Sequence, residues 1–251
     1  MKIRYLIYNP AGNITALVKG DKFNKKQKRI INNAIMNENS EVEQVGFLSL
    51  EKKKLSMAGG EFCGNATRCA ALYYLNKDNE IEVEINDKIL KAGIDNKNKI
   101  WCEIPVNECQ IQKLDEKIYK IKLSGITIIP REIQAENILN ENLKSEAVNI
   151  IKKYEIDDNA IGIMFYQDNL MYPVVWVKAI NTLFVENSCG SGTIGLSILK
   201  SFLSNKDGDY TIKQPSGKIL ETSIKIENKK IVRAILKGEI TTDNIEKEII
   251  L

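Results

Sequence analysis

The sequence predicts an α+β protein made of two similar lobes, each a β-barrel-like sheet wrapped around a central helix. Three observations lead to this prediction. Short strand patterns alternate with a few helical ones, the phrase AGGEFCGNATRCAALYYL around Cys63 returns as ENSCGSGTIGLSIL around Cys189, and Lys-Ile-Leu follows both copies. The offset is 126 residues from Cys63 to Cys189 and 130 from Lys88 to Lys218. Such a constant offset indicates that the chain is a duplication.

In the first half, the expected strands are short apolar or alternating runs between turn residues. Asn9 to Asn13 reads as a turn that joins two strands into a hairpin-like start. Between Asn24 and Asn37 the apolar residues Ile30, Ile31, Ala34 and Ile35 recur at i and i+4, as on the apolar face of an amphipathic helix. The expected strands are 2–8, 14–20, 42–50, 80–86, 88–94 and 99–105, and the expected helices are 24–37 and the segment after Cys63.

The second half repeats this order of elements. Its expected strands lie within 118–130, 161–167, 172–180, 210–214, 218–226 and 230–236, and its expected helices are 141–154 and the segment after Cys189. Apolar content dips between Asn107 and Lys122, which places the boundary between the lobes there. The predicted lobes are residues 1–117, carrying Cys63, and residues 118–251, carrying Cys189, whose last residues can pack back on the first lobe.

The composition is that of an ordinary globular protein. Hydrophobic residues make up 43% of the chain, charged residues make up 27%, and the net charge of +3 is spread along it. No Lys/Arg block alternates with aromatic residues, and no apolar stretch approaches the roughly 18 residues of a membrane span. We therefore expect a small-molecule partner, no nucleic acid and no membrane. The oligomeric state stays open, with a homodimer among the alternatives.

Cysteine and histidine usage narrows the chemistry further. The five cysteines, an odd number, follow a start without a cleavable signal pattern, which indicates reduced thiols in the cytoplasm. The chain contains no histidine. Ser-His-Asp catalysis, Cys-His catalysis, histidine-ligated zinc and imidazole acid/base chemistry are therefore excluded. Proton transfer near neutral pH falls to carboxylates, lysines, tyrosines or cysteines.

The two cysteine phrases each precede an apolar helix and suit acid/base work beside a carboxylate. The first amides of a helix are unpaired and carry partial positive charge, so two such starts form a cradle for an anion. The same charge is expected to lower the pKa of a cysteine at the helix start. Two thiols on opposite sides of one carbon can remove a proton from one face and return one to the other. This stereoinversion needs no metal and no pyridoxal cofactor.

The remaining candidates have plainer interpretations beside the functional ones. Cys69, Cys102 and Cys109 are expected to be small buried apolar residues. A zinc site is disfavoured without a CxxC pair or a histidine, and a phosphate-binding loop is disfavoured because no Gly-Lys-Ser/Thr follows either phrase. Asn13 favours either a left-handed turn or a ligand contact, and Gln44, in an apolar strand, is expected at a pocket wall.

Together these motifs resemble the diaminopimelate epimerase superfamily of cofactor-independent racemases and epimerases, across essentially the whole chain. CGNATRCAA resembles the first cysteine motif of that family, SCGSGT the second, NPAGNITALV its N-terminal Gly-Asn signature and EQVGFL its Asp-Gln strand. The resemblance implies a fold of two half-barrels, each around a helix. It also implies the following site: catalytic Cys63 and Cys189; Gly64, Asn65, Gly190 and Ser191 binding the α-carboxylate; and Asn13 and Gln44 contacting substrate.

The sequence departs from the family where diaminopimelate epimerases bind the distal carboxylate of their substrate. The Glu-Arg-Gly group before the second cysteine matches Ile180-Asn181-Thr182, which holds no arginine; a family asparagine falls on Gly162, and Gly-Asn-Pro-His corresponds to residues 124–127. Diaminopimelate is therefore not the expected substrate.

The phrases NPAGN, GGEFCGNA and TLFVENSCGSGT resemble most those of the histidine racemases. In that interpretation Glu186 contacts the ammonium group or the side chain of the substrate, whereas its plainer interpretation is a surface strand residue. Other amino-acid substrates, including diaminopimelate, proline-type and basic ones, stay open. A phenazine-biosynthesis-type isomerase, which would lack the cysteine pair, and a non-catalytic amino-acid-binding protein are the alternatives from other classes.

Overall fold

A computed structural model describes the chain except for residues 21, 50, 77, 135–139 and 179–181. The chain forms two compact units. The first comprises Met1–Ile104 with Lys237–Leu251, and the second comprises Pro105–Leu236. Residues 105–117 belong to the second unit because β8 (Gln110–Lys113) pairs with β9 (Tyr119–Leu123) there.

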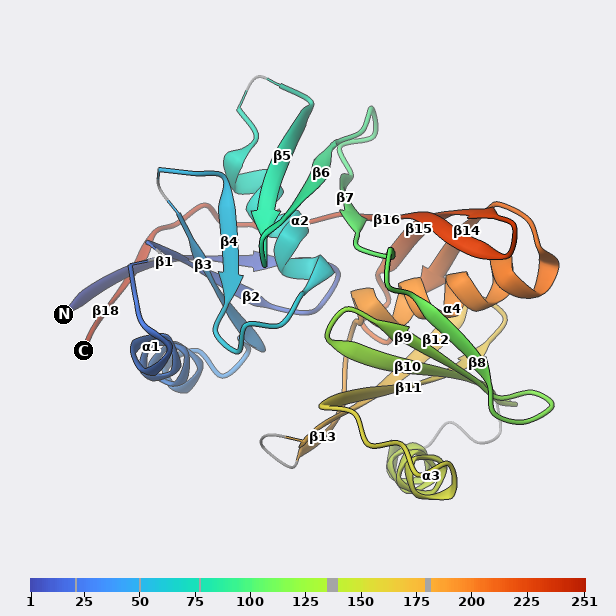
Figure 1. Cartoon of the computed structure of the whole chain (residues 1–251). Helices are drawn as coiled ribbons and strands as arrows, with labels where there is room; N and C mark the ends of the chain where they lie inside the picture. The colour runs from blue at the N-terminus through green and yellow to red at the C-terminus, as the bar shows by residue number, and fades with distance from the viewer. Residues whose placement is uncertain (21, 50, 77, 135–139, 179–181) are drawn as a thin grey trace. The chain divides into compact units, whose positions relative to one another are not determined.

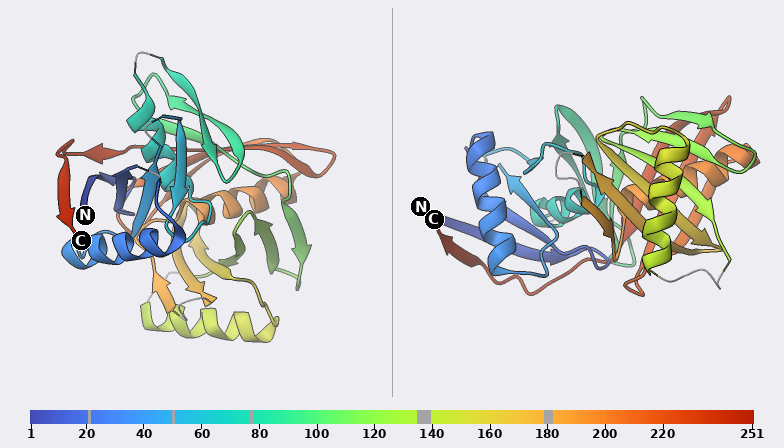
Figure 2. Two further views of the ribbon diagram at one scale, coloured as in Figure 1. Left: turned by 60° about the vertical axis from the view of Figure 1, so that its left-hand side comes forward. Right: turned by 90° about the horizontal axis from the view of Figure 1, so that it is seen from below.

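The first unit contains two helices and a series of short strands (Figure 1). Its helices are α1 (Lys25–Glu38) and α2 (Gly64–Tyr74). Its strands are β1 (Lys2–Asn9), β2 (Thr15–Lys19), β3 (Gln44–Leu48), β4 (Lys54–Met57), β5 (Glu80–Ile85), β6 (Lys88–Ile94), β7 (Ile100–Ile104), β17 (Thr241–Thr242) and β18 (Lys247–Ile250). The last strand pairs antiparallel with the first, so the two chain ends lie side by side (Figure 2).

The second unit is built in the same way. Its helices are α3 (Asn140–Lys153) and α4 (Gly190–Ser204). Its further strands are β10 (Ile126–Glu132), β11 (Ala160–Gln167), β12 (Leu170–Val177), β13 (Thr182–Val185), β14 (Gly208–Lys213), β15 (Ile219–Glu227) and β16 (Lys230–Gly238), whose last two residues belong to the first unit.

Strand pairing within each unit shows the internal repeat directly. In the first unit β1–β2, β3–β4 and β5–β6 are antiparallel, whereas β2–β3 and β4–β5 are parallel. In the second unit β9–β10, β11–β12 and β14–β15 are antiparallel, whereas β10–β11 and β12–β14 are parallel. Parallel neighbours need a crossover, and the helices supply it at matching places. The units therefore share one topology.

The first helix of each unit lies outside its strands. Helix α1 begins after Asn24, whose side chain accepts from the Gln27 amide while the Gln27 side chain accepts from the Asn24 amide, a capping box. Ile31 and Ile35 are fully buried against β1–β3 as the spacing predicts, whereas Ile30 is exposed and Ala34 is half-buried, so the buried face is narrower than the predicted one. Figure 2 shows α1 and α3 at the periphery of their units.

The second helix of each unit is central. Helix α2 contacts β2, β4, β5, β6 and β7, and α4 contacts β9, β10, β11, β14 and β15. Both are buried along most of their length, because small or apolar residues surround nearly the whole helix. The α+β class and the central helix of each unit are as the sequence predicts. Each central helix begins at one of the two cysteine phrases.

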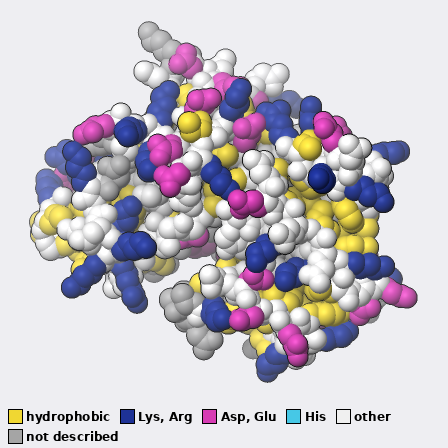
Figure 3. All heavy atoms as spheres, in the orientation of Figure 1, with side chains coloured by type: hydrophobic (Ala, Val, Ile, Leu, Met, Phe, Trp, Pro, Cys, Tyr) yellow, Lys and Arg dark blue, Asp and Glu magenta, His cyan; other side chains and the backbone are white. Residues whose placement is uncertain are grey.

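The surface carries mixed charge. On the face in Figure 3, Lys and Arg side chains are interspersed with Asp and Glu, and neither sign gathers into one field. None of the helices in the described residues combines the length and the hydropathy that a membrane crossing requires.

Candidate active site

The two central helices begin with the same local geometry. Cys63 is the N-cap of α2 with φ −134° and ψ 113°, and Cys189 is the N-cap of α4 with φ −132° and ψ 107°. The Sγ of Cys63 accepts from the Ala66 amide at 3.4 Å, and the Sγ of Cys189 accepts from the Gly192 amide at the same distance. Each sulfur therefore lies at the positive end of its helix.

A threonine locks each helix start. The hydroxyls of Thr67 and Thr193 donate to the carbonyl oxygens of Cys63 and Cys189, both at 2.7 Å. Helices ordinarily begin with Ser, Thr, Asp or Asn, whose oxygen caps better than sulfur. Asn65 and Ser191 have side chains suited to capping, but they lie in the first turns, and the cysteines themselves are the caps. A thiol at both cap positions therefore points to chemistry rather than to helix stability.

In the first unit, four predicted site residues join one hydrogen-bond network. The Cys63 thiol donates to Gln44 Oε1 at 3.1 Å. Gln44 Nε2 donates to Thr15 Oγ1 at 2.7 Å and also to Asn13 Oδ1. Asn65 Nδ2 donates to the same Asn13 oxygen at 3.2 Å. Asn13 and Asn65 are buried and Gln44 is half-buried.

Protonation of Cys63 differs from the sequence-based expectation. Burial raises the pKa of its thiol to about 11, although the Ala66 amide opposes this. The helix start therefore reduces the effect of burial without overcoming it, and Cys63 is a thiol at neutral pH.

In the second unit, Cys189 is fixed through its backbone. Its amide donates to Gln214 Oε1 at 3.1 Å, and Gln214 Nε2 donates to Thr193 Oγ1 at 3.1 Å. Gln214 is fully buried, and sequence reasoning missed it. The sequence signal that could have identified it is the side-chain amide of Gln214 at the end of the YTIKQ strand, shortly before the repeated Lys-Ile-Leu.

The other predicted residues of this unit lie around the start of α4. Gly190 is buried and Ser191 is half-buried in the first turn. Glu186 is half-buried just after β13, and its amide donates to the Pro173 carbonyl at 3.0 Å. The Ser188 hydroxyl is buried and has no hydrogen-bond partner in the described part of the chain.

Met164 fills the space where the family asparagine would lie. A Cβ at Gly162 would come within 2.4 Å of Met164 Cε, and one at Gly192 within 2.2 Å of its Sδ. This wall of the second unit is therefore apolar. Of the stretch that matches the family arginine, Ile180 and Asn181 lie outside the described residues.

Three further cysteines and the carboxylate of Glu43 lie outside the set of predicted site residues. Cys69 and Cys102 are fully buried as predicted, and Cys109 is partly buried. Within the described residues no group of His, Cys, Asp or Glu could hold a metal ion. Glu43, which sequence reasoning did not single out, accepts from the Asn13 side-chain amide, so a carboxylate also belongs to this network.

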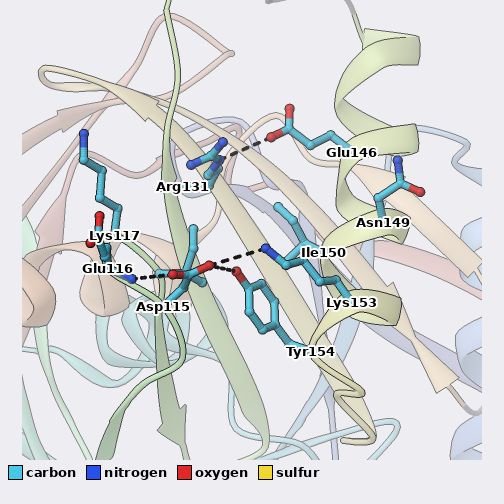
Figure 4. Close-up of a pocket in the computed structure, with 10 residues that line it drawn as sticks. Asp115, Glu116, Lys117, Arg131, Glu146, Asn149, Ile150, Lys153 and Tyr154 are labelled. Atoms are coloured by element: carbon cyan, nitrogen blue, oxygen red, sulfur yellow. Dashed lines mark hydrogen bonds and ion pairs between the residues drawn. The ribbon is translucent and has the colours of Figure 1, made fainter.

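A separate hollow in the second unit, of about 500 Å³, contains none of the predicted residues (Figure 4). Several of its charges are paired, because Arg131 pairs with Glu146 at 3.2 Å and Asp115 accepts from Lys153 and Tyr154. This pairing leaves little to attract a ligand.

Comparison with solved structures gives the fold. A phenazine biosynthesis protein of the PhzF family from Bacillus anthracis has a TM-score of 0.70 at 12% identity, with 100% of both chains covered. A hydroxyproline epimerase from Agrobacterium vitis, solved with trans-4-hydroxy-L-proline, has a TM-score of 0.64 at 11% identity, covering 99% of this chain and 91% of that chain. The chain has the diaminopimelate epimerase-like fold that the motifs implied.

Sequence relatives give the class of enzyme. A histidine racemase of Fusobacterium nucleatum is 34% identical over 235 residues, 85% of this chain and 86% of that protein, and one from Staphylococcus aureus is 25% identical over 266 residues, 96% and 95%. The chain is an isomerase, an amino-acid racemase. It belongs to the histidine racemase family, because the model described as histidine racemase CntK N-terminal domain matches residues 2–244.

Proposed function

We propose that this racemase acts on histidine and inverts the α-carbon with Cys63 and Cys189. One cysteine removes the α-proton, and the other returns a proton to the opposite face. The observation that carries the proposal is the recurrence of one arrangement, a thiol at the N-cap of the central helix, in both units. Racemisation runs in both directions, so a pair of acid/base groups of the same kind suits it.

The starts of the two helices hold the α-carboxylate in this proposal. Amides at Gly64 and Asn65 of α2, and at Gly190 and Ser191 of α4, lie in first turns, whose N–H groups lack intrahelical partners. Negative charge develops on the carboxylate side when the α-proton leaves. Preorganised amides stabilise that charge without reorganisation, which makes the α-proton removable by a thiolate.

The protonation state of Cys63 assigns its first role. Its thiol donates to Gln44 and its pKa is raised to about 11, so in the resting enzyme Cys63 is the acid. Cys189 then removes the proton from the enantiomer that this form binds. The other enantiomer requires the opposite form, with Cys63 as the thiolate.

Charge and shape near the site favour a cationic amino acid without a distal carboxylate. Glu43 accepts from Asn13 in the first unit, and Glu186 precedes Cys189 in the second. Met164 makes the wall at Gly162 apolar, and an unpaired carboxylate buried there would cost several kcal/mol. In this proposal Asn13, Gln44 and Glu186 contact the ammonium group or the imidazole of histidine, and diaminopimelate is excluded.

We further propose that the enzyme works in the cytoplasm, where both thiols stay reduced, and that it makes D-histidine without pyridoxal phosphate or a metal. The test is racemisation of L-histidine by protein dialysed against EDTA, followed by chiral chromatography. We expect full activity without any absorbance from pyridoxal phosphate, and activity on diaminopimelate lower by orders of magnitude. A requirement for pyridoxal phosphate or a divalent metal would contradict the mechanism.

A matched pair of variants separates an enzyme from a binding protein. Cys63→Ser and Cys189→Ser keep the size of the cap residue but replace the thiol by a far weaker acid. A racemase loses turnover and keeps histidine binding, measured by calorimetry. Unchanged turnover in either variant would remove the two-cysteine mechanism while leaving the racemase family intact.

A further inference from the structure

Arg68, in the phrase CGNATRCAA, lies in the core of the first unit, with no anionic partner among the described residues. Its side chain is fully buried on α2. Its Nη2 donates to Asn65 Oδ1 at 2.8 Å, whereas its Nε and Nη1 are buried with no hydrogen-bond partner in the described residues. A buried guanidinium is normally paired with a carboxylate. An uncompensated one is costly, and its presence needs a reason.

The charged forms nearest to Arg68 would be thiolates. Burial lowers the pKa of the Arg68 guanidinium, which stays protonated at neutral pH, while negative charge on Cys102, Cys69 or Cys63 would raise it. Burial raises the pKa of Cys102 to about 12 and raises that of Cys69 further, so both stay neutral. Cys102 also donates to the Gly64 carbonyl at 3.6 Å, which suits a thiol. The resting unit therefore keeps a net positive charge in the interior behind the start of α2.

Hydrogen bonds connect this charge to the reactive sulfur. Arg68 donates to Asn65, Asn65 donates to Asn13, and Gln44 bridges Asn13 and Cys63. Each link is a side-chain amide in a buried or half-buried position. Electrostatic effects are strong where water is excluded, so an anion that forms at Cys63 gains from the guanidinium behind it.

We propose that Arg68 is a positioning residue whose buried charge favours the thiolate of Cys63, with Asn65 held in place between the two. The inference deepens the proposed function, on which it rests for its role in turnover. It explains how a buried thiol becomes a base when the enzyme processes the second enantiomer. The proton of Cys63 leaves to the substrate carbanion in one direction, and Arg68 stabilises the sulfur anion that remains.

The test measures the alkylation of each cysteine by iodoacetamide at pH 8.5, with peptides resolved by mass spectrometry. Arg68→Met and Arg68→Gln remove the charge at similar volume, and Arg68→Lys keeps it. Because alkylation follows the thiolate fraction, one pKa unit corresponds to about tenfold in rate. We expect Cys63 to react about tenfold more slowly in both neutral variants and within about threefold of wild type in Arg68→Lys. Cys189 is the internal control and should not change.

A structural role would give a different result. Removing an unpaired buried charge should leave the thermal midpoint of Arg68→Met unchanged or higher. An unchanged Cys63 rate in a folded neutral variant would overturn the proposal. So would failure of both neutral variants to fold while Arg68→Lys folds, because that result assigns Arg68 to the stability of the core.

Kinetics adds an arm that depends on turnover. The equilibrium constant of racemisation is one, so kcat/KM for the two enantiomers must fall equally in Arg68→Met. The basic limb of the pH profile, which reports loss of the Cys63 proton from the resting form, should move to higher pH by about one unit. Alkylation needs no substrate. An inactive wild type would therefore refute the proposed function alone, and an unchanged Cys63 rate would refute the role of Arg68 alone.

Discussion

Gln44→Glu places a carboxylate beside the sulfur of Cys63 and should lower the fraction of that cysteine that is present as the thiolate. In the wild-type protein, Gln44 Oε1 accepts from Cys63 Sγ at 3.1 Å. The substitution keeps the shape of the side chain and adds a negative charge within hydrogen-bonding distance. Since the carboxylate repels a thiolate and accepts from a thiol, the pKa of Cys63 should rise above about 11.

The size of the effect follows from distance and exposure. Two unit charges about 4 Å apart interact by roughly 4 kcal/mol at an effective dielectric constant of 20. Gln44 is half-buried, so solvent screening reduces this to about 2 kcal/mol. That corresponds to about 1.5 pKa units and about a thirtyfold lower thiolate fraction at any pH well below the pKa.

The assay is alkylation of Cys63 at pH 8.5, together with the pH profile of kcat/KM for both enantiomers of histidine. Gln44→Met is the matched control, because like Gln44→Glu it removes the hydrogen bonds that Gln44 donates to Asn13 and Thr15, but it adds no charge. We expect Gln44→Glu to react about thirtyfold more slowly at Cys63 and the control to stay within about threefold. Equal rates for the two variants would refute the electrostatic reasoning and leave only a loss of hydrogen bonds.

Three further predictions test the fold and the mechanism. Gly195→Ala should lower the free energy of unfolding in urea by about 2 kcal/mol. The added Cβ would lie 2.5 Å from Cγ2 and 2.8 Å from Cβ of the β-branched Ile128. A stability equal to that of the wild type would show that Ile128 can shift to make room. Cys63→Ala and Cys189→Ala should each abolish racemisation, measured by chiral chromatography, since each direction needs both an acid and a base. In deuterium oxide, the product enantiomer should gain deuterium at the α-carbon before the recovered substrate does; mass spectrometry that finds both pools labelled equally early would indicate a single base.

Much of the fold could be predicted because the duplication constrains both halves at once. The alternation in 80–86 became β5, with Ile81, Val83 and Ile85 buried. The strand β4 was missed because it is only four residues long and follows directly on the lysine run 52–54, with only Leu55 and Met57 buried. The strand β18 was not assigned, although the last residues were expected to pack back on the first lobe, because its pairing with β1 joins the two ends of the chain and no local pattern gives its bounds.

For the candidate site, too, local patterns could be predicted from the sequence and tertiary contacts could not. Cys63 and Cys189 were predicted because the repeated phrases mark the helix starts, whereas the environment of each sulfur comes from distant strands. A helix start alone predicts a lowered pKa for Cys63, but the burial that raises this pKa depends on tertiary packing. Arg68 and Gln214 were missed for a related reason. A buried polar residue is recognised by its lack of exposure, which a sequence does not display.

The two helix starts match in backbone geometry and threonine lock but differ in what surrounds the sulfur. Cys63 donates its thiol proton to Gln44, whereas the buried Cys189 is held by its amide on Gln214. A racemase cannot use this difference to favour one product, because the two enantiomers have equal free energy. The difference can only set which of the two cysteines carries the proton in the resting enzyme. It therefore sets which enantiomer the resting enzyme binds. In the proposed mechanism, the buried charge of Arg68 favours the less stable form, with Cys63 as the thiolate, and so allows the enzyme to return to its starting form.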